Sequence, residues 1–250
     1  MKRGLLLIDR GSREKEAKDE LEYICKKVQQ KGNYAFANYC FLEVIPPFIE
    51  EGITDCLKTG IDSLTIVPYF LYPGRKVKLA VAEVASLQAK TRVKFTITKP
   101  MSMHKAMVEI VDSKIESALA KNNITLSKDK IDVLVIGHGS KDPDARTSIK
   151  YIVDNLSSTY KNADYCFLEI EEPNIMQGIQ KFDEMNPEVL VIVFYFLHEG
   201  AHVKRDIYED LNPALEKSKL KKTIITEHIG TDDKMIEFIL ERAHEVENAN

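Results

Sequence analysis

The feature that most constrains this chain is an internal repeat. The five residues Tyr39–Glu43 recur unchanged as Tyr165–Glu169. Two further blocks recur in the same order, at a similar separation of about 126–128 positions. These blocks are residues 4–13 with 132–141, and 67–74 with 193–200. A chain of 250 residues therefore contains two copies of one domain, and we expect the copies to span residues 1–124 and 125–250.

Each copy alternates short apolar runs with amphipathic helical patterns. Leu5–Ile8 and Val133–Ile136 are apolar runs that lead into a Gly-Ser pair, which is typical of a strand covered on both faces. We expect three more strands in each copy. They lie at residues 35–42, 64–71 and 93–98 in the first copy, and at 162–168, 189–197 and 223–226 in the second. Four strands that alternate with helices predict two parallel α/β domains.

The composition excludes several classes of protein. No apolar run approaches the roughly 18 residues that a membrane helix needs, so we expect no membrane partner. The net charge of −4 argues against a nucleic-acid partner. The four cysteines show no CxxC spacing and are typical of reduced thiols, which favours a cytoplasmic location.

Residues with metal-binding chemistry follow three strands of the second copy. His138 follows the first strand, Glu169 the second, and His198 and His202 the third. Ligands of parallel α/β sheets bind beyond the carboxyl ends of the strands, so these side chains are expected at one edge. Imidazoles suit late first-row divalent metals, and a carboxylate can complete the ligand set or accept a proton. The alternative is that each histidine is an ordinary loop residue.

The first copy has different chemistry at the same positions. Arg10 and Lys76 stand where His138 and His202 stand in the second copy, whereas Glu43 is retained. Two permanent cations would repel a divalent metal ion. Arg10 and Lys76 therefore either bind carboxylates of a ligand, or are solvated or paired with nearby acidic residues.

The combined motifs resemble those of the sirohydrochlorin chelatases, class II enzymes that work without ATP. The resemblance rests on His-Gly-Ser at 138–140, on Phe-Leu-Glu at 167–169, and on Tyr-Phe-Leu-x-x-Gly-x-His-Val-x-x-Asp-Ile at 195–207. It covers almost the whole chain, which looks like the long form with two fused domains. The resemblance implies a chelatase-like fold, close to flavodoxin-like, with the tetrapyrrole in a cleft between the halves.

The resemblance also implies the activity and the site. The chain is expected to insert Fe²⁺ into sirohydrochlorin to form sirohaem, with Co²⁺ insertion for the corrinoid pathway as the alternative. His138 and His202 match the two metal-handling histidines of the family, and Glu169 matches its acidic residue. From its place after the third strand, His198 is expected as a subsidiary metal ligand. No nucleotide is expected, because the chain lacks the G-x-x-x-x-G-K-[ST] phosphate loop.

Sirohydrochlorin is a polycarboxylate, so its cleft should present cations and backbone amides. The candidate substrate-binding residues are Arg10, Ser12, Glu43, Lys76, Ser140 and Lys204. For the two serines, N-capping of the following helix is the simpler interpretation.

Two other classes of function are weighed against a chelatase. A protein that carries metal or tetrapyrrole without turnover would fit the altered first copy. A dehydrogenase or flavin protein on a similar sheet is disfavoured, because no G-x-G-x-x-G follows the first strand. A monomer is favoured, because the fusion of two copies places a pair of domains within one chain.

Overall fold

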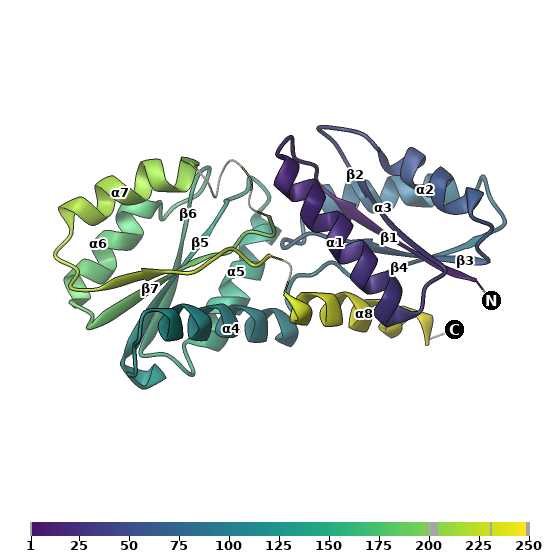
Figure 1. The fold of residues 1–250 in the computed structure, drawn as a ribbon. Coiled ribbons are helices and arrows are strands. Elements are labelled where there is room, and N and C mark those ends of the chain that lie inside the picture. The colour runs from purple at the N-terminus through teal and green to yellow at the C-terminus, as the bar shows by residue number, and fades with distance from the viewer. Residues whose placement is uncertain (1, 199, 201–204, 231, 249–250) are drawn as a thin grey trace. The chain divides into compact units, whose positions relative to one another are not determined.

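The computed structural model describes residues 2–198, 200, 205–230 and 232–248. It contains two sheets, each of four strands (Figure 1). The first sheet has the order β2-β1-β3-β4, and the second has the matching order β6-β5-β7-β8. All strand pairs are parallel. The strands are β1 Arg3–Asp9, β2 Phe36–Phe41, β3 Ser63–Pro68, β4 Lys94–Ile97, β5 Ile131–Gly137, β6 Asn162–Phe167, β7 Val189–Phe194 and β8 Thr223–Ile225. The predicted pair of parallel α/β domains is confirmed.

Helices follow the strands in both sheets. They are α1 Lys15–Gly32, α2 Ile49–Lys58, α3 Arg75–Gln88, α4 Lys105–Lys121, α5 Pro143–Leu156, α6 Ile175–Met185, α7 Ile207–Lys217 and α8 Asp233–Glu247, with a short 3₁₀ turn at Lys128–Lys130. The start of α5 follows from local sequence. Asp142 accepts a hydrogen bond from the backbone of Asp144, and Pro143 occupies the first turn of α5. None of the helices in the described part of the chain has both the length and the apolar character that crossing a membrane requires.

The central strands are buried on both faces, as their apolar runs predict. Leu5, Leu6 and Leu7 have no exposed surface, and β5 is buried along its whole length. The apolar run of β3 was expected to continue as strand to Leu71, but β3 ends at Pro68. Strand β7 ends at the equivalent Phe194, and in both repeats a tight turn follows, in which the N–H of Phe70 donates to Pro68 and that of Phe196 to Phe194. The turn takes the chain out of the sheet, and the apolar residues after Pro68 are buried as loop. The expectation that Pro68 lies near a strand end is confirmed.

The compact units of the structure differ from the sequence repeats. One unit contains residues 1–102 and 231–250, and the other contains residues 103–230. Helix α4, the last helix of the first repeat, therefore belongs to the unit of the second sheet, and α8, the last helix of the second repeat, belongs to the unit of the first sheet. Helix α8 contacts α1, β3 and β4, whereas α4 contacts α5, β7 and β8. In Figure 1, α8 (yellow) runs beside α1 (purple). The expected boundary between residues 124 and 125 divides the repeated sequences but not these compact units.

One carboxylate near the end of helix α8 joins the helix to its unit, in addition to the buried apolar face of the helix. Glu247 accepts hydrogen bonds from Arg3 at 2.5 Å, from the Tyr34 hydroxyl at 2.9 Å and from the Thr65 hydroxyl at 2.5 Å. Its side chain is 12% exposed. Burial, followed by the charge of Glu247, raises the pKa of Tyr34 well above its usual value, so this tyrosine stays a donor. The three donors come from β1, β3 and the segment after α1, so this side chain bonds the last helix to three separate parts of the unit.

We predict that Glu247→Ala lowers the free energy of unfolding by about 2–3 kcal/mol, because it leaves three part-buried donors without their acceptor. Urea-induced unfolding measures this loss. Glu237→Ala is the matched control on the same helix, since Glu237 makes only a 4.0 Å contact with Lys31 and is 68% exposed. An equal loss in the two variants would show that Glu247 has no special part in holding α8.

Candidate metal site

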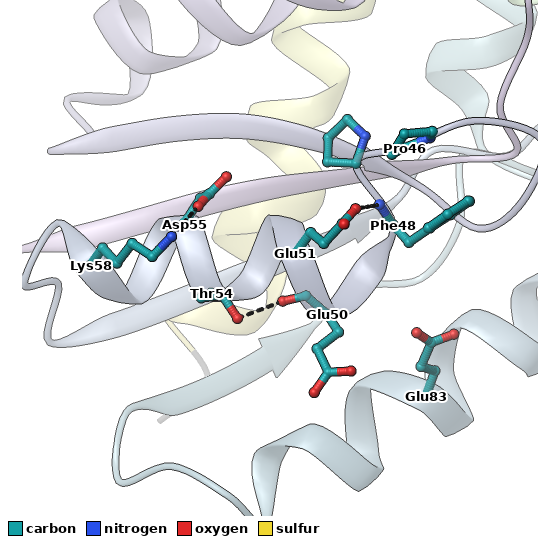
Figure 2. A pocket seen from close by; sticks show the side chains of 9 residues that line it. Pro46, Phe48, Glu50, Glu51, Thr54, Asp55, Lys58 and Glu83 are labelled. Atoms are coloured by element: carbon teal, nitrogen blue, oxygen red, sulfur yellow. Dashed lines mark hydrogen bonds and ion pairs between the residues drawn. The ribbon is translucent and has the colours of Figure 1, made fainter.

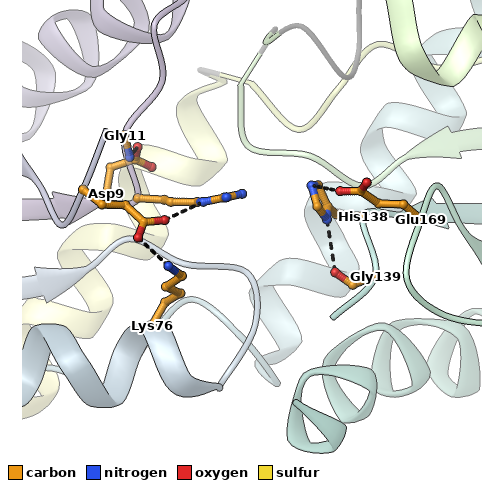
Figure 3. Close-up of polar contacts among 8 residues, drawn as sticks. Asp9, Gly11, Lys76, His138, Gly139 and Glu169 are labelled. Carbon is orange, nitrogen blue, oxygen red and sulfur yellow. Dashed lines mark hydrogen bonds and ion pairs between the residues drawn. The ribbon is translucent and has the colours of Figure 1, made fainter. Parts of the chain in front are cut away.

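An imidazole and a carboxylate meet at the carboxyl end of the second sheet. His138 follows β5 and Glu169 follows β6, and the two strands are neighbours in the sheet. The Nε2 atom of His138 lies 3.1 Å from Oε1 of Glu169 (Figure 3). The imidazole is 20% exposed and the carboxylate 50% exposed. The predicted convergence of these two side chains is therefore present.

A glycine allows this close approach. Gly139 has a φ of +92°, which disfavours other residues, and a Cβ at this position would lie 1.9 Å from the carbonyl oxygen of Glu169. The backbone N–H of Glu169 donates to the carbonyl oxygen of His138 at 3.1 Å. The two loops are thus joined through their backbones, which sets the distance between the two functional side chains.

The hydrogen bonds of His138 indicate what the site can hold. Its Nδ1 lies 3.1 Å from the carbonyl oxygen of Gly139, which can only accept, so this contact is a hydrogen bond in the tautomer that has its proton on Nδ1. In that tautomer the neutral ring turns its Nε2 lone pair towards the Glu169 carboxylate, and a cation between the two atoms makes this arrangement favourable. Two ligands about 2.1 Å from one metal ion, at roughly 90–110°, lie about 3.0–3.4 Å apart. The observed separation suits a shared proton or a shared metal ion.

The turn after Glu169 is strained. The backbone N–H of Glu171 donates to the carbonyl oxygen of Glu169 at 2.8 Å, which places Ile170 at a φ of +73°. A β-branched residue rarely adopts this conformation, and such strain costs about 1–3 kcal/mol. Val44, at the same place in the first repeat, has a φ of +79°. The tight turn ends the loop immediately after the carboxylate and restricts where that carboxylate can go.

Glu171 and Arg146 support the loop, and the sequence analysis did not identify them. Glu171 is 12% exposed at its side chain and accepts from the backbone N–H of Ser140 at 2.9 Å and from Nε of Arg146 at 2.8 Å. The repeat alignment contains a signal that could have found this pair, because the first copy has Ile45 and Lys18 at these positions. Only the second copy has this carboxylate beneath its loop.

The serines of the two Gly-Ser pairs do not cap helices directly. Ser140 Oγ accepts from the backbone N–H of Asp142 at 3.0 Å, and Ser12 Oγ accepts from that of Glu14 at 3.1 Å. Both hydroxyls close a turn one step before the helix, and the N-cap positions belong to Asp142 and Glu14. The expected N-capping role is therefore corrected to a turn-closing role.

The corresponding place in the first repeat contains an ion-pair cluster. Arg10 Nε lies 3.1 Å from Oε1 of Glu43, and the Lys76 ammonium donates to the other carboxylate oxygen. Lys76 is labelled in Figure 3. The hydrogen bond from Lys76, and secondarily that from Arg10, lowers the pKa of Glu43, although burial acts in the opposite direction. Of the alternatives left open for the two cations, pairing with Glu43 is what the structure shows.

The remaining candidates lie on the loop after β7. His198 is half-buried there, whereas His202 and Lys204 lie outside the described residues. Among the residues that the structure describes, no group of three or more His, Cys, Asp or Glu side chains is arranged to hold a metal ion. His138 and Glu169 thus form a pair of candidate ligands, and a third ligand stays a prediction.

A cavity of about 880 Å³ in the first unit lies elsewhere (Figure 2). It is lined by residues 46–48, by one side of α2 as far as Lys58 and by Glu83 of α3, and its lining includes neither Arg10 nor Glu43. Burial, and then the neighbouring charge of Glu50, raises the pKa of Glu83. No histidine or cysteine lines this cavity, so its chemistry differs from that of the candidate metal site.

Comparison with known proteins places these features in a family. The sequence model of the CbiX family matches the chain twice, at residues 4–118 and 132–246. The chain belongs to the CbiX family. The two matches correspond to the two copies of the sequence repeat.

Relatives of this CbiX-family chain include two proteins of Priestia megaterium. A sirohydrochlorin cobaltochelatase is 24% identical, with 97% of this chain and 79% of the relative covered. A sirohydrochlorin ferrochelatase is 23% identical, with 92% and 85% covered. SirB from Bacillus subtilis with Fe³⁺ has a similar fold, with a TM-score of 0.82 at 23% identity over 98% of this chain and 95% of that one.

We predict that Gly139→Ala disrupts the site, because the added methyl group meets the Glu169 carbonyl oxygen. The free energy of unfolding should fall by about 2–4 kcal/mol. Gly60→Ala is the control, since Gly60 also has a positive φ (+71°) but no atom within 4 Å of a Cβ; it should cost about 1 kcal/mol. Equal losses in urea unfolding would show that the steric contact is not the cause.

We predict that Lys76→Met raises the pKa of Glu43 towards the ordinary glutamate value of about 4.3. In the wild type the pKa of Glu43 is lower in the folded than in the unfolded chain. The cluster therefore stabilises the fold at pH values above the ordinary glutamate pKa, and this stabilisation is lost as the pH falls through the lowered pKa of the folded state. The contribution is small because the carboxylate is 35% exposed. Carboxyl-carbon NMR titration measures the shift, and Arg10→Met should give a smaller rise; an unchanged pKa in Lys76→Met would contradict the assignment.

Proposed function

We propose that this chain is a sirohydrochlorin chelatase that inserts Fe²⁺ into sirohydrochlorin to form sirohaem without ATP. The observation that carries the proposal is the 3.1 Å approach of His138 Nε2 to Glu169 Oε1 at the carboxyl edge of the second sheet. Membership of the CbiX family supports it, as do relatives named sirohydrochlorin ferrochelatase and cobaltochelatase. The metal ion is a substrate, and no nucleotide is required.

The chemistry requires three tasks of the site. Water must leave the metal ion, the ion must reach the face of the macrocycle, and two pyrrole nitrogens must lose their protons. We propose that His138 and Glu169 hold the ion with few protein ligands, which leaves coordination positions open for ring nitrogens. His138 is the favoured proton acceptor, because its Nε2 lone pair becomes free once the ion has passed to the ring nitrogens, and Glu169 is the alternative.

We propose His202 as a further ligand, with His198 in a subsidiary role. Support comes from the first repeat, where the ammonium group of Lys76 reaches the Glu43 carboxylate. Lys76 aligns with His202 in the repeat. A side chain at this position can therefore approach the glutamate that follows the second strand of a repeat, and an imidazole at residue 202 would complete a two-histidine, one-carboxylate set.

The substrate carboxylates need cationic partners. We propose that Arg10 and Lys76, together with Lys204, bind them, and that Glu43 orients the first two. The Arg10–Glu43–Lys76 cluster supports this, because two cations share one carboxylate and retain a net positive charge. The hydroxyls of Ser12 and Ser140 are proposed as additional donors. The Ser140 backbone amide is already used by Glu171.

Co²⁺ insertion for the corrinoid pathway is the alternative reaction, since a relative that covers 97% of this chain is named a cobaltochelatase. The anaerobic reaction of sirohydrochlorin with Fe²⁺, Co²⁺ and Ni²⁺, followed spectrophotometrically with and without protein, tests the proposal. Accelerated insertion of Fe²⁺ at substoichiometric protein supports a ferrochelatase. Binding without turnover would overturn the proposal in favour of a carrier protein.

We propose that the chain works as a cytoplasmic monomer. All four cysteines are free and buried, as suits a reducing compartment. The fused repeat supplies two domains within one chain, which makes a second chain unnecessary. Sedimentation equilibrium tests the monomeric state, and a dimer at micromolar concentration would contradict it.

We predict that His138→Ala and His202→Ala each lower kcat/KM by about 100-fold or more, which corresponds to a loss of at least about 2.7 kcal/mol of transition-state stabilisation. Arg10→Ala should retain part of the activity, because it removes a cation from the other repeat. His198→Ala should have a smaller effect than either of the first two. A near-complete loss in Arg10→Ala would show that the first repeat takes part in catalysis directly.

A further inference from the structure

A carboxylate supports the loop after the first strand in each repeat, but it comes from a different element in the two copies. In the first repeat the buried Asp9, at the end of β1, accepts from the backbone N–H of Gly11 at 2.8 Å. The second repeat has Gly137 at the position of Asp9. Its loop is supported by Glu171, which accepts from the backbone N–H of Ser140 at 2.9 Å. In the second repeat the support thus comes from the neighbouring loop rather than from the loop's own strand.

The Glu171 carboxylate links the two loops that carry the candidate metal ligands. Glu171 lies two residues after Glu169, and the amide from which it accepts lies two residues after His138. The backbone N–H of Glu169 donates to the carbonyl oxygen of His138. A Cβ on Gly139 would lie 3.5 Å from the backbone nitrogen of Glu171, so the two loops are in close contact here as well. The carboxylate therefore closes a hydrogen-bonded ring that includes the backbone of both candidate ligands.

Arg146 restricts the side chain of Glu171 to this position. Its Nε donates to the second carboxylate oxygen at 2.8 Å, and a terminal nitrogen donates to the carbonyl oxygen of Glu172 at 2.9 Å. The guanidinium group also lies over the ring of Phe167, 5.4 Å from its centroid. Because Arg146 is held at the end of β6 and by the loop that follows, it orients Glu171 towards Ser140 and balances its charge.

We infer that Glu171, kept in place by Arg146, is a positioning residue that holds His138 Nε2 and Glu169 Oε1 at the separation that a shared metal ion needs. The inference rests on the proposed function for the assignment of these two side chains as metal ligands. It adds that their spacing depends on a further carboxylate, whose two oxygens are both taken by donors of the protein.

The physical reason is preorganisation. Without Glu171 the amide of Ser140 loses its acceptor, and the loop gains conformations in which the imidazole of His138 and the carboxylate of Glu169 lie farther apart. Restoring their spacing then costs free energy whenever a metal ion binds. Removal of a group that orients metal ligands in this way typically lowers metal affinity by about 10–100-fold.

Two double variants separate positioning from charge. Glu171→Gln/Arg146→Met and Glu171→Ala/Arg146→Met each remove one negative and one positive charge, so both keep the net charge of the wild type. Only the glutamine retains an oxygen that can accept from Ser140. Equilibrium dialysis measures the dissociation constant for Co²⁺, counted as the binding that His138→Ala abolishes.

We expect the glutamine variant to keep this dissociation constant within about threefold of the wild type, and the alanine variant to bind about 10-fold more weakly. A merely electrostatic or merely stabilising ion pair would affect both variants alike, because both lose it. Equal affinities in the two variants would therefore overturn the inference.

Amide hydrogen exchange tests the positioning without a metal ion. The N–H of Glu169, which joins the two loops, should exchange at least about 10-fold faster in the alanine variant than in the glutamine variant, whereas the N–H of Val135 in β5 should not change. Equal exchange of the Glu169 amide would contradict the inference. If the wild type binds no Co²⁺, the proposed function fails, and the exchange rates still decide whether Glu171 positions the two loops.

Circular dichroism and urea unfolding check that each variant folds. Should the alanine variant not fold, Glu171→Ile/Arg146→Lys replaces it, because isoleucine and lysine stand at the corresponding positions of the first repeat. This variant also lacks the acceptor for Ser140 and should show the same faster exchange at Glu169. Exchange as slow as in the glutamine variant would overturn the inference.

Discussion

The candidate site depends on the contact between a glycine and a carbonyl oxygen. In each repeat the loop after the first strand passes so close to the loop after the second strand that no Cβ fits between them. This contact places the residue before the glycine beside the glutamate, whatever that residue is. Histidine at 138 and arginine at 10 consequently reach their carboxylates over the same 3.1 Å. The backbone contact fixes where the two side chains lie, and the residue type before the glycine decides their chemistry.

The fold could be predicted from the sequence because buried parallel strands have a simple pattern. The apolar runs of β1 and β5 and the Gly-Ser pairs that follow them are local signals. The ends of β3 and β7 were predicted too late, since their apolar runs continue into loops that cover the sheet. The exchange of α4 and α8 between units has no local signal. Both helices bury an apolar face, and the contacts that join α8 to its unit include those of Glu247 with residues far away in the sequence.

The part of the site that follows from the strand order of the sheets could be predicted. Loops after adjacent parallel strands must lie at one edge, which brings His138 and Glu169 together and leads Arg10 to Glu43. The role of Glu171 could not be derived in this way, because a carboxylate two residues beyond the conspicuous one resembles a solvated loop residue. Only the structure shows that it accepts from Ser140 and Arg146. The strained turn at Ile170 also has no sequence signature, since positive φ is not expected of isoleucine.

The exchange of the last helices has a consequence for folding during synthesis. The contact of Arg3 with Glu247 joins residues 244 positions apart, so the first unit to emerge from the ribosome cannot be completed until almost the whole chain has been made. The unit of residues 103–230 is continuous in the sequence and can fold first. Until α8 has been made, one face of the sheet formed by β1–β4 lacks this helix. Contacts of such long sequence separation slow folding and prolong the exposure of apolar surface. This chain therefore completes its N-terminal domain last.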